Sequence, residues 1–408
     1  MTEQRPFDVV IWGASGFTGR LVADYMLKQY GVNGAVRWAI AGRNQAKLEQ
    51  IRARLGDAAR EIAILIADGH DLNSLQTLAR QTRVVCSTVG PYALYGSLLV
   101  AACVETGTDY CDLTGEVQWM RKMIDAHQTA AEASGARIVH TCGFDSIPSD
   151  MGVFYIQKIM RERHGVVSPQ IKYRTATFKG GVSGGTIASL MNVLVEAQRD
   201  PTIRKIIGNP YALNPADERR GPDRNEPFKP VFDRDFGLWT APFFMASVNT
   251  RVVRRTNALL GYAYGRDFRY DEAMATGKGA LGYAKALSVS AAFGGVVAAG
   301  AFAPTRSLLN RILPESGAGP NEAAREAGMF KILLWGKHPT DASKNVRGSV
   351  SGDRDPGYGA TAKMLAESAV CLAKDEIAVG GGFWTPASAL GESLLQRLQT
   401  NAGLSFSS

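Results

Sequence analysis

The first third of the chain alternates short apolar runs with amphipathic stretches. The amphipathic stretches, such as residues 44–55 and 98–107, are typical of helices. The apolar runs are five or six residues long and occupy residues 7–12, 36–41, 62–67, 84–89, 109–113 and 136–141. Strands that are apolar on both faces and separated by helices form a parallel sheet with helices on each side. The pattern therefore predicts an α/β fold, with an N-terminal Rossmann doubly wound parallel sheet over residues 1–147.

A different pattern follows this region. Residues 171–178 alternate like a half-buried strand, and residues 185–200 have a helical pattern. Residues 329–337 and 345–353 look like two strands that can pair with each other. We therefore predict a second, α+β substrate domain over residues 148–356. A helical pattern in residues 357–373 opens a C-terminal helical segment, which we place at residues 357–408.

Two segments of the second domain stand out by composition. Residues 208–230 contain five prolines, which exclude regular structure and predict an excursion or lid. Residues 286–303 carry no charge and are almost long enough to span a bilayer. Most of them are Ala, Gly or Ser, which drive membrane insertion only weakly. We expect a buried or interface helix here; the alternatives are peripheral membrane contact and a full span.

Composition excludes several classes of protein. The net charge of +8 is mild for 408 residues, and no long basic run interleaved with aromatic residues is present, so we expect no nucleic-acid partner. The excess suits anionic partners such as nucleotide phosphates, an acidic carrier protein or an anionic lipid surface. Five cysteines without a CxxC pair predict reduced thiols and no metal site. The first ten residues lack the features of a signal peptide, so we expect a cytoplasmic protein.

Three glycines follow the first apolar run and open a helical pattern. Gly13, Gly16 and Gly19 have the G-x-x-G-x-x-G spacing of a dinucleotide-binding turn. A Cβ at Gly13 or Gly16 would hold the backbone away from a pyrophosphate, and Gly19 lets the helix lie close to the strand. The helix N-terminus adds free N–H groups and a positive potential. Cofactor contacts are also expected from the residues between the glycines, namely Ser15, Phe17 and Thr18.

The second apolar run predicts which nucleotide binds. An NAD enzyme usually ends this strand with Asp or Glu, which binds the ribose 2′-hydroxyl. Here the run ends in Ala41 and Gly42, and Arg43 follows. Its guanidinium can bond a 2′-phosphate bidentately, and Asn44 and Lys47 can assist from the next turn. These residues predict NADP(H) as the cofactor.

The fourth apolar run leads into residues 87–96, "STVGPYALYG". Val89, Gly90 and Pro91 are expected to run along the nicotinamide side of the cofactor. Tyr92 and Tyr95 would then lie near the reacting end, where a phenol can donate a proton as hydride arrives at the neighbouring carbon. Either tyrosine can equally be a packing residue.

The sixth apolar run leads into a second polar cluster. His140 lies within the run and is expected to be a satisfied core histidine. Pro148 suits the first turn of the following helix, for which we expect Asp145, Ser146 or Ser149 to provide a cap.

These residues together resemble the saccharopine dehydrogenase-like oxidoreductases, specifically the group that contains trans-acting enoyl reductases. The likeness extends over nearly the whole chain and rests on "GASGFTGRLVADY", "WAIAGRN", "TVGPYALYG", "YCDLTGE", "HTCGFDSIPSD", "NTRVVRRTNALLGYAYGRDFRYDEA", "DPGYGATAKMLAESAVCLA" and "GGGFWTPASALGESLLQRL". The resemblance implies an NADP-binding Rossmann domain, a mixed α+β domain and a C-terminal helix that returns to the first domain. It also implies reduction of a carbon–carbon double bond on a carrier-bound polyketide or lipid precursor, in glycolipid-type lipid synthesis. It provides no secure proton donor.

The leading hypothesis is therefore an NADPH-dependent enoyl reductase that acts on an α,β-unsaturated acyl thioester. The apolar stretch "WTAPFFMASV" (239–248) favours a lipid-like substrate on an acyl carrier or polyketide synthase, although such a run also suits a core. One alternative is a saccharopine-type amino-acid dehydrogenase, which needs several arginines gathered around substrate carboxylates. Another is a non-catalytic NADP-binding protein associated with lipid or membrane. Peripheral contact with the inner face of the plasma membrane and a homodimer both stay open.

Overall fold

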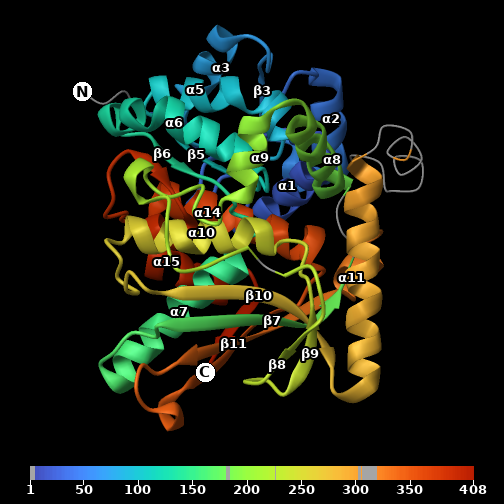
Figure 1. Ribbon diagram of the computed structural model, residues 1–408. Coiled ribbons are helices and arrows are strands. Elements are labelled where there is room, and N and C mark those ends of the chain that lie inside the picture. Colours follow the sequence, from blue (N-terminus) through green and yellow to red (C-terminus); the bar gives the residue numbers. More distant parts are fainter. Residues whose placement is uncertain (1–4, 181–183, 226, 302–304, 306–318) are drawn as a thin grey trace.

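The computed structural model describes residues 5–180, 184–225, 227–301, 305 and 319–408, and two seven-stranded sheets organise them (Figure 1). The first sheet is entirely parallel and has the strand order β13-β6-β5-β4-β1-β2-β3. Its strands are β1 (Phe7–Trp12), β2 (Trp38–Gly42), β3 (Ala63–Ile66), β4 (Thr82–Ser87), β5 (Asp109–Asp112), β6 (Arg137–Val139) and β13 (Gly382–Trp384). Each of the six predicted strands of the Rossmann sheet is present, so this part of the fold prediction is confirmed.

Helices follow the strands of the first sheet, as parallel connections require. They are α1 (Phe17–Tyr30), α2 (Gln45–Arg54), α3 (Leu72–Ala79), α4 (Tyr92–Tyr95), α5 (Ser97–Glu105) and α6 (Val117–Ser134). A further helix, α14 (Thr361–Lys374), comes from the C-terminal part and packs against α1, β1, β4 and β5. Its buried Glu367 accepts hydrogen bonds from the hydroxyls of Tyr25 (2.7 Å) and Tyr30 (2.6 Å). The expected return of a C-terminal helix to the first domain is confirmed.

The second sheet is mixed and has the order β14-β12-β11-β7-β10-β9-β8. Only β7 and β10 pair in parallel; the other neighbours are antiparallel, including the two strands predicted to pair, β11 and β12. The strands are β7 (Gln170–Lys179), β8 (Val231–Asp233), β9 (Leu238–Ala241), β10 (Arg269–Gly277), β11 (Met329–Lys337), β12 (Val346–Gly352) and β14 (Leu404–Ser407). Around them lie α7 (Ile147–His164), α8 (Gly184–Arg199), α9 (Pro201–Gly208), α10 (Ala246–Leu259), α11 (Gly279–Ala301), α13 (Glu322–Glu326) and α15 (Pro386–Thr400).

The C-terminal part contributes to both sheets. Besides the helices α14 and α15, it contains β13, which extends the first sheet beside β6, and β14, which pairs with β12. The sequence pattern predicted only helices here, because three or four residues are too few to show a strand period. The division of the chain at residues 147 and 356 stays a prediction.

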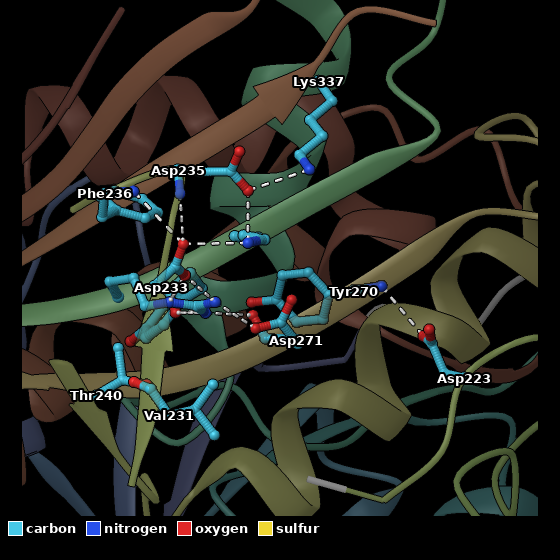
Figure 2. A network of polar contacts seen from close by, with 12 residues as sticks. Asp223, Val231, Asp233, Asp235, Phe236, Thr240, Tyr270, Asp271 and Lys337 are labelled. Carbon is cyan, nitrogen blue, oxygen red and sulfur yellow. Dashed lines mark hydrogen bonds and ion pairs between the residues drawn. The ribbon is translucent and has the colours of Figure 1, made fainter. Parts of the chain in front are cut away.

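A network of ion pairs joins the strands of the second sheet (Figure 2). Asp233, the last residue of β8, accepts bonds from Lys172 Nζ (3.1 Å) and Arg174 Nη2 (2.5 Å) of β7. Asp235, in the turn between β8 and β9, binds Lys172 and Lys337 of β11. Burial opposes the charged form of Asp233, but the two cations outweigh it and lower its pKa. The network therefore fixes the β8–β9 hairpin onto the sheet.

Buried arginines hold the proline-rich segment in place. Helix α9 ends at Gly208, and within the described part of residues 209–230 the only regular element is one 3₁₀ turn, Ala216–Glu218. Arg251 Nε donates to the carbonyl of Asn209 (3.0 Å), and Arg254 Nη1 donates to that of Pro210 (3.1 Å). Arg255 donates to the carbonyl of Leu213. All three arginines are buried and lie on α10, so their hydrogen bonds hold the proline-rich segment against this helix.

The apolar helix α11 is largely exposed. Of the expected buried or interface helix, the buried alternative was therefore wrong, and the interface alternative stays a prediction. The helix stands along one side of the molecule (Figure 1), and only 11% of its most apolar window is buried. Contact with β9, β10 and α8 covers one narrow face, whereas Leu281 (69% exposed) and Leu287 (50%) point to solvent. By length and composition it is the one helix in the described ranges that could cross a membrane. The last two residues of the predicted segment, 302 and 303, lie outside the described residues.

Candidate functional site

A cavity of about 980 Å³ opens at the carboxyl edge of the first sheet, where doubly wound folds bind their ligands. The loops after β1, β2, β3, β4, β5 and β6 form one end of it, and α8, α10, α11 and the segment before α10 form the other. Ten predicted site residues line this cavity: Gly13, Ser15, Gly16, Phe17, Thr18, Arg43, Val89, Gly90, Tyr92 and Tyr95. The other three, Gly19, Asn44 and Pro91, lie beside it without lining it.

The three glycines of the turn have different structural roles. Gly13 has a φ of +87°, and a Cβ there would overlap the side chain of Val89, so the fold itself requires glycine at this position. A Cβ at Gly19 would overlap the carbonyl oxygen of Gly13, which shows how closely α1 approaches the β1 turn. Gly16 is exposed, and a Cβ there would meet only the Gly13 carbonyl oxygen, at 3.2 Å.

Gly16 is also the N-cap of α1, and no side chain caps the helix. The first N–H groups of α1 therefore face the cavity beside Ser15, Phe17 and Thr18, without a side-chain acceptor. This arrangement suits a phosphate group, since the N–H groups and the helix dipole both favour negative charge.

Arg43 lies at the carboxyl end of β2, on the wall of the cavity. Its side chain is exposed, and no hydrogen bond or ion pair joins it to another described residue. Asn44 is the N-cap of α2, and its side-chain oxygen accepts the Lys47 N–H at 2.9 Å. Arg43 is thus available to an anionic ligand, whereas the side-chain oxygen of Asn44 already has a partner.

The two candidate tyrosines occupy different surroundings. Tyr92 is buried, donates its hydroxyl hydrogen to the Ser87 carbonyl (3.1 Å) and packs on Trp119 with ring centroids 5.4 Å apart. Burial raises the pKa of its phenol well above the usual range, which makes the neutral form more stable still. Tyr95 is 46% exposed and lies edge-on to His70, which follows β3. Tyr95 therefore lies on the Arg43 side of the cavity, because β3 neighbours β2.

A buried carboxylate that the sequence analysis did not single out positions this turn. Glu116, in the loop after β5, accepts the N–H groups of Tyr92 (2.7 Å) and Ala93 (3.0 Å) at the start of α4. Its Oε1 also accepts the hydroxyl of Ser189 on α8, at 2.9 Å. Glu116 thus links α4 of the first part to α8 of the second. The sequence shows Glu116 within the motif "YCDLTGE", but it does not show the contact with α8, because that contact depends on the tertiary fold.

Asp145, expected to be a helix cap, has another position. The N-cap of α7 is Ser146, and no side chain bonds the free N–H groups of this helix, so the expected side-chain cap was wrong. The Ser146 hydroxyl instead donates to Asn249 Oδ1 of α10, at 3.1 Å. Asp145 lines the cavity, and burial raises the pKa of its carboxyl to about 7. Pro148 lies in the first turn of α7, as expected.

His140 belongs to the core and does not line the cavity. Its Nδ1 lies 2.7 Å from Asp112 Oδ2, and its ring packs between Trp119, Tyr110 and Phe383. Nε2 is buried without a hydrogen-bond partner among the described residues, so the expected core histidine is satisfied at one nitrogen.

The far end of the cavity is apolar. Side chains from four separate elements meet there, namely Leu190, Val193, Leu194, Phe228, Phe243, Phe244, Met245, Phe293 and Val297. Phe243 and Phe244 belong to the stretch that suggested a lipid-like substrate, and their rings lie 5.2 Å apart. Two arginines on this wall are bound to backbone carbonyls: Arg204 to that of Ala197 (2.7 Å) and Arg251 to that of Asn209.

Comparison with known proteins decides the family. Residues 9–139 match the saccharopine dehydrogenase NADP binding domain. The chain is 42% identical over 418 residues to a Mycobacterium tuberculosis protein that is provisionally named a trans-acting enoyl reductase. The match covers 98% of this chain and 97% of that protein. It is 36% identical to the trans-acting enoyl reductase of Mycobacterium leprae, with 97% and 96% covered. This protein belongs to the trans-acting enoyl reductase family.

The fold and the cofactor of this family member follow from the same comparisons. Saccharopine dehydrogenase (L-Glu forming) of Saccharomyces cerevisiae superposes with a TM-score of 0.54 at 11% identity, covering 98% of this chain and 99% of that one, which shows a shared fold. The match to the NADP-binding domain confirms the expectation of NADP(H). The geometry fits that cofactor, since Gly16 leaves space beside free N–H groups and Arg43 stands where NAD-binding strands carry an acid.

Proposed function

We propose that this protein reduces the carbon–carbon double bond of an α,β-unsaturated acyl thioester, with NADPH as the reductant. One observation carries the proposal: a single cavity joins the glycine-rich turn and Arg43 at one end to a wall of aliphatic and aromatic side chains at the other. The names of the relatives support the same reaction. The acyl chain would be held on an acyl carrier or a polyketide synthase, as an intermediate of lipid or glycolipid biosynthesis.

The residues of the cavity have separate tasks in this reaction. NADPH, when bound, supplies a hydride for the β-carbon of the substrate. Gly13, Gly16 and the N-terminus of α1 would hold the pyrophosphate, and Arg43 the 2′-phosphate. The apolar wall, including Phe243 and Phe244, would bind the acyl chain and exclude water from the reacting carbons.

The amino-acid dehydrogenase alternative finds less support in the cavity. A substrate with two or three carboxylates needs several arginines free to bind them. Arg204 and Arg251, at the apolar end, donate to backbone carbonyls, so their guanidinium groups have structural partners. Arg43 lies at the other end, beside the glycine-rich turn.

The decisive experiment compares substrates. NADPH oxidation is measured with an enoyl thioester, presented both on a small pantetheine carrier and on an acyl carrier protein, and separately with a keto acid plus an amino acid. We expect turnover with the enoyl thioester and saturated thioester as product. Turnover only with the keto acid and amine would replace the proposal by the dehydrogenase, and NADPH binding without turnover of either would favour a non-catalytic protein.

The location of the protein is part of the proposal. We place it in the cytoplasm, where reduced thiols and NADPH are available; the five cysteines are all free and buried. The exposed apolar face of α11, with Leu281 and Leu287, supports peripheral contact with a membrane or with a second copy of the chain. Either contact would bury the exposed side chains of Leu281 and Leu287.

A further inference from the structure

The strand order of the first sheet indicates where the proton donor must lie. The loop after β2 carries Arg43 and would hence face the adenosine end of a bound NADPH. In a doubly wound sheet the dinucleotide extends across the carboxyl edge, so its nicotinamide end would lie over the opposite strands, β4 to β6. The group that protonates the substrate must line the cavity on this side.

Neither candidate tyrosine meets that requirement. Tyr95 contacts His70 after β3 and thus lies on the adenosine side. Tyr92 is on the correct side, but its hydroxyl hydrogen is given to the Ser87 carbonyl, and the Leu113 N–H approaches the same oxygen at 3.4 Å. Donation from Tyr92 to a substrate would require breaking a buried hydrogen bond.

Asp145 has both the required position and the required freedom. It follows β6 directly, lines the cavity and is only partly covered. Its carboxyl group lies beside Gly143 and interacts with its own backbone N–H, and no other side chain among the described residues forms a hydrogen bond or ion pair with it. The ionisable neighbour whose charge acts on it is Asp112 of β5, which is bonded to His140.

We propose that Asp145 is the proton donor to the α-carbon of the acyl thioester; this rests on the proposed enoyl reduction. Addition of hydride at the β-carbon leaves the electron pair of the double bond as a thioester enolate. The O–H bond of the Asp145 carboxyl then breaks, and a C–H bond forms at the α-carbon, which gives the saturated thioester. Asp145 is left as a carboxylate and regains its proton from water. The net change is one hydride from NADPH and one proton from solvent added across the double bond.

The electrostatics of the site support this role. Burial, with a smaller contribution from the charge of Asp112, raises the pKa of Asp145 to about 7, so a substantial fraction is protonated at neutral pH. A donor must hold its proton, so the rate should fall as the pH rises through this pKa. The raised pKa also affects stability. Between the ordinary Asp pKa of the unfolded state and the raised pKa of the folded state, only the folded state keeps the proton on Asp145. The stability that this proton provides is therefore lost as the pH rises through about 7.

The test compares Asp145→Asn with Asp150→Asn. Asp150 is a matched control because burial raises its pKa to about 7 as well, but it is bonded to Thr256 and the Ala387 N–H and does not line the cavity. We expect Asp145→Asn to lower turnover of an enoyl thioester by about 100-fold, with the Kd for NADPH unchanged by fluorescence titration. Asp145→Glu should recover part of the rate, and Asp150→Asn should keep it. The fall in rate above the pKa should be present in the wild type and absent in Asp145→Asn.

A second measurement does not depend on turnover. Unfolding midpoints in denaturant, followed from the ordinary Asp pKa of about 4 to about pH 8, should show the wild type losing stability relative to Asp145→Asn as the pH rises towards 7. Equal pH dependence, or full activity of Asp145→Asn, would overturn the assignment of Asp145 alone. A wild type that binds NADPH but turns over no enoyl thioester would instead overturn the proposed function, and the role of Asp145 with it.

Discussion

The cofactor end and the acyl end of the cavity are built in different ways. At the cofactor end the backbone of the β1–α1 turn forms the surface, and Gly13, Gly16 and Arg43 lie within about thirty residues of one another. At the acyl end the surface consists of side chains from α8, α11, the proline-rich segment and residues before α10. The first end is therefore sensitive to single atoms added to the backbone, and the second to changes in polarity spread over many side chains.

The largest effect is expected from Gly16→Val. Its backbone is extended (φ −76°, ψ 169°) and accepts valine, but the new side chain would fill the space beside the first N–H groups of α1. The Kd for NADPH should rise at least about 100-fold, which corresponds to about 2.7 kcal/mol. Gly294→Val, where a Cβ meets nothing within 4 Å, is the control and should bind normally. Normal binding by the Gly16 variant would show that the turn does not hold the cofactor.

A charge at the acyl end should separate the two functions of the cavity. Val193→Asp places a carboxylate in the apolar wall, whereas Val195→Asp on the same helix lies off the cavity. We expect kcat/KM for a long-chain enoyl thioester to fall about 10- to 100-fold, because burying an unpaired polar group costs about 1–3 kcal/mol. The Kd for NADPH should not change. Equal losses in both variants would mean that the substrate binds elsewhere.

Arg43→Ala tests the specificity of the cofactor end. A charge-assisted contact with the 2′-phosphate is worth about 1.5–3 kcal/mol, so the wild type should prefer NADPH over NADH at least about tenfold. The substitution should remove most of this preference and leave NADH binding almost unchanged. Arg54→Ala, on the exposed surface of α2, serves as the control. Equal affinity of the wild type for both cofactors would contradict the role of Arg43.

Helix α11 lines the acyl end of the cavity with Phe293 and Val297, while most of the helix is exposed. In cell fractionation we expect any membrane-bound protein to be released by high salt or carbonate, because small residues dominate the helix and insert weakly. Leu281→Glu with Leu287→Glu should shrink the bound fraction further. Retention in the pellet until detergent is added would show that the helix is inserted.

The smallest effect is expected from Tyr95→Phe. The ring lies on the adenosine side, beside His70, so removal of the hydroxyl should change turnover at saturating NADPH by less than about twofold. Tyr92→Phe should instead cost stability, about 0.5–1.5 kcal/mol, through the lost bond to the Ser87 carbonyl. A loss of about 100-fold in turnover for either variant would return the proton donor to that tyrosine.

The sequence by itself determined the Rossmann sheet, the glycine-rich turn and the choice of NADP(H), because each depends on short-range patterns. A strand period, a G-x-x-G-x-x-G spacing and a missing acid at the end of β2 can all be recognised without knowing what packs against them. Only the tertiary structure decided the rest. The burial of the α10 arginines, the exposure of α11, the contact of Tyr95 with His70 and the position of Asp145 on the cavity wall all depend on partners distant in sequence. The fold determines which residues lie beside an apolar helix or a polar side chain, and so whether the helix is covered or the side chain is paired. These neighbours are distant in sequence, so local sequence patterns do not identify them.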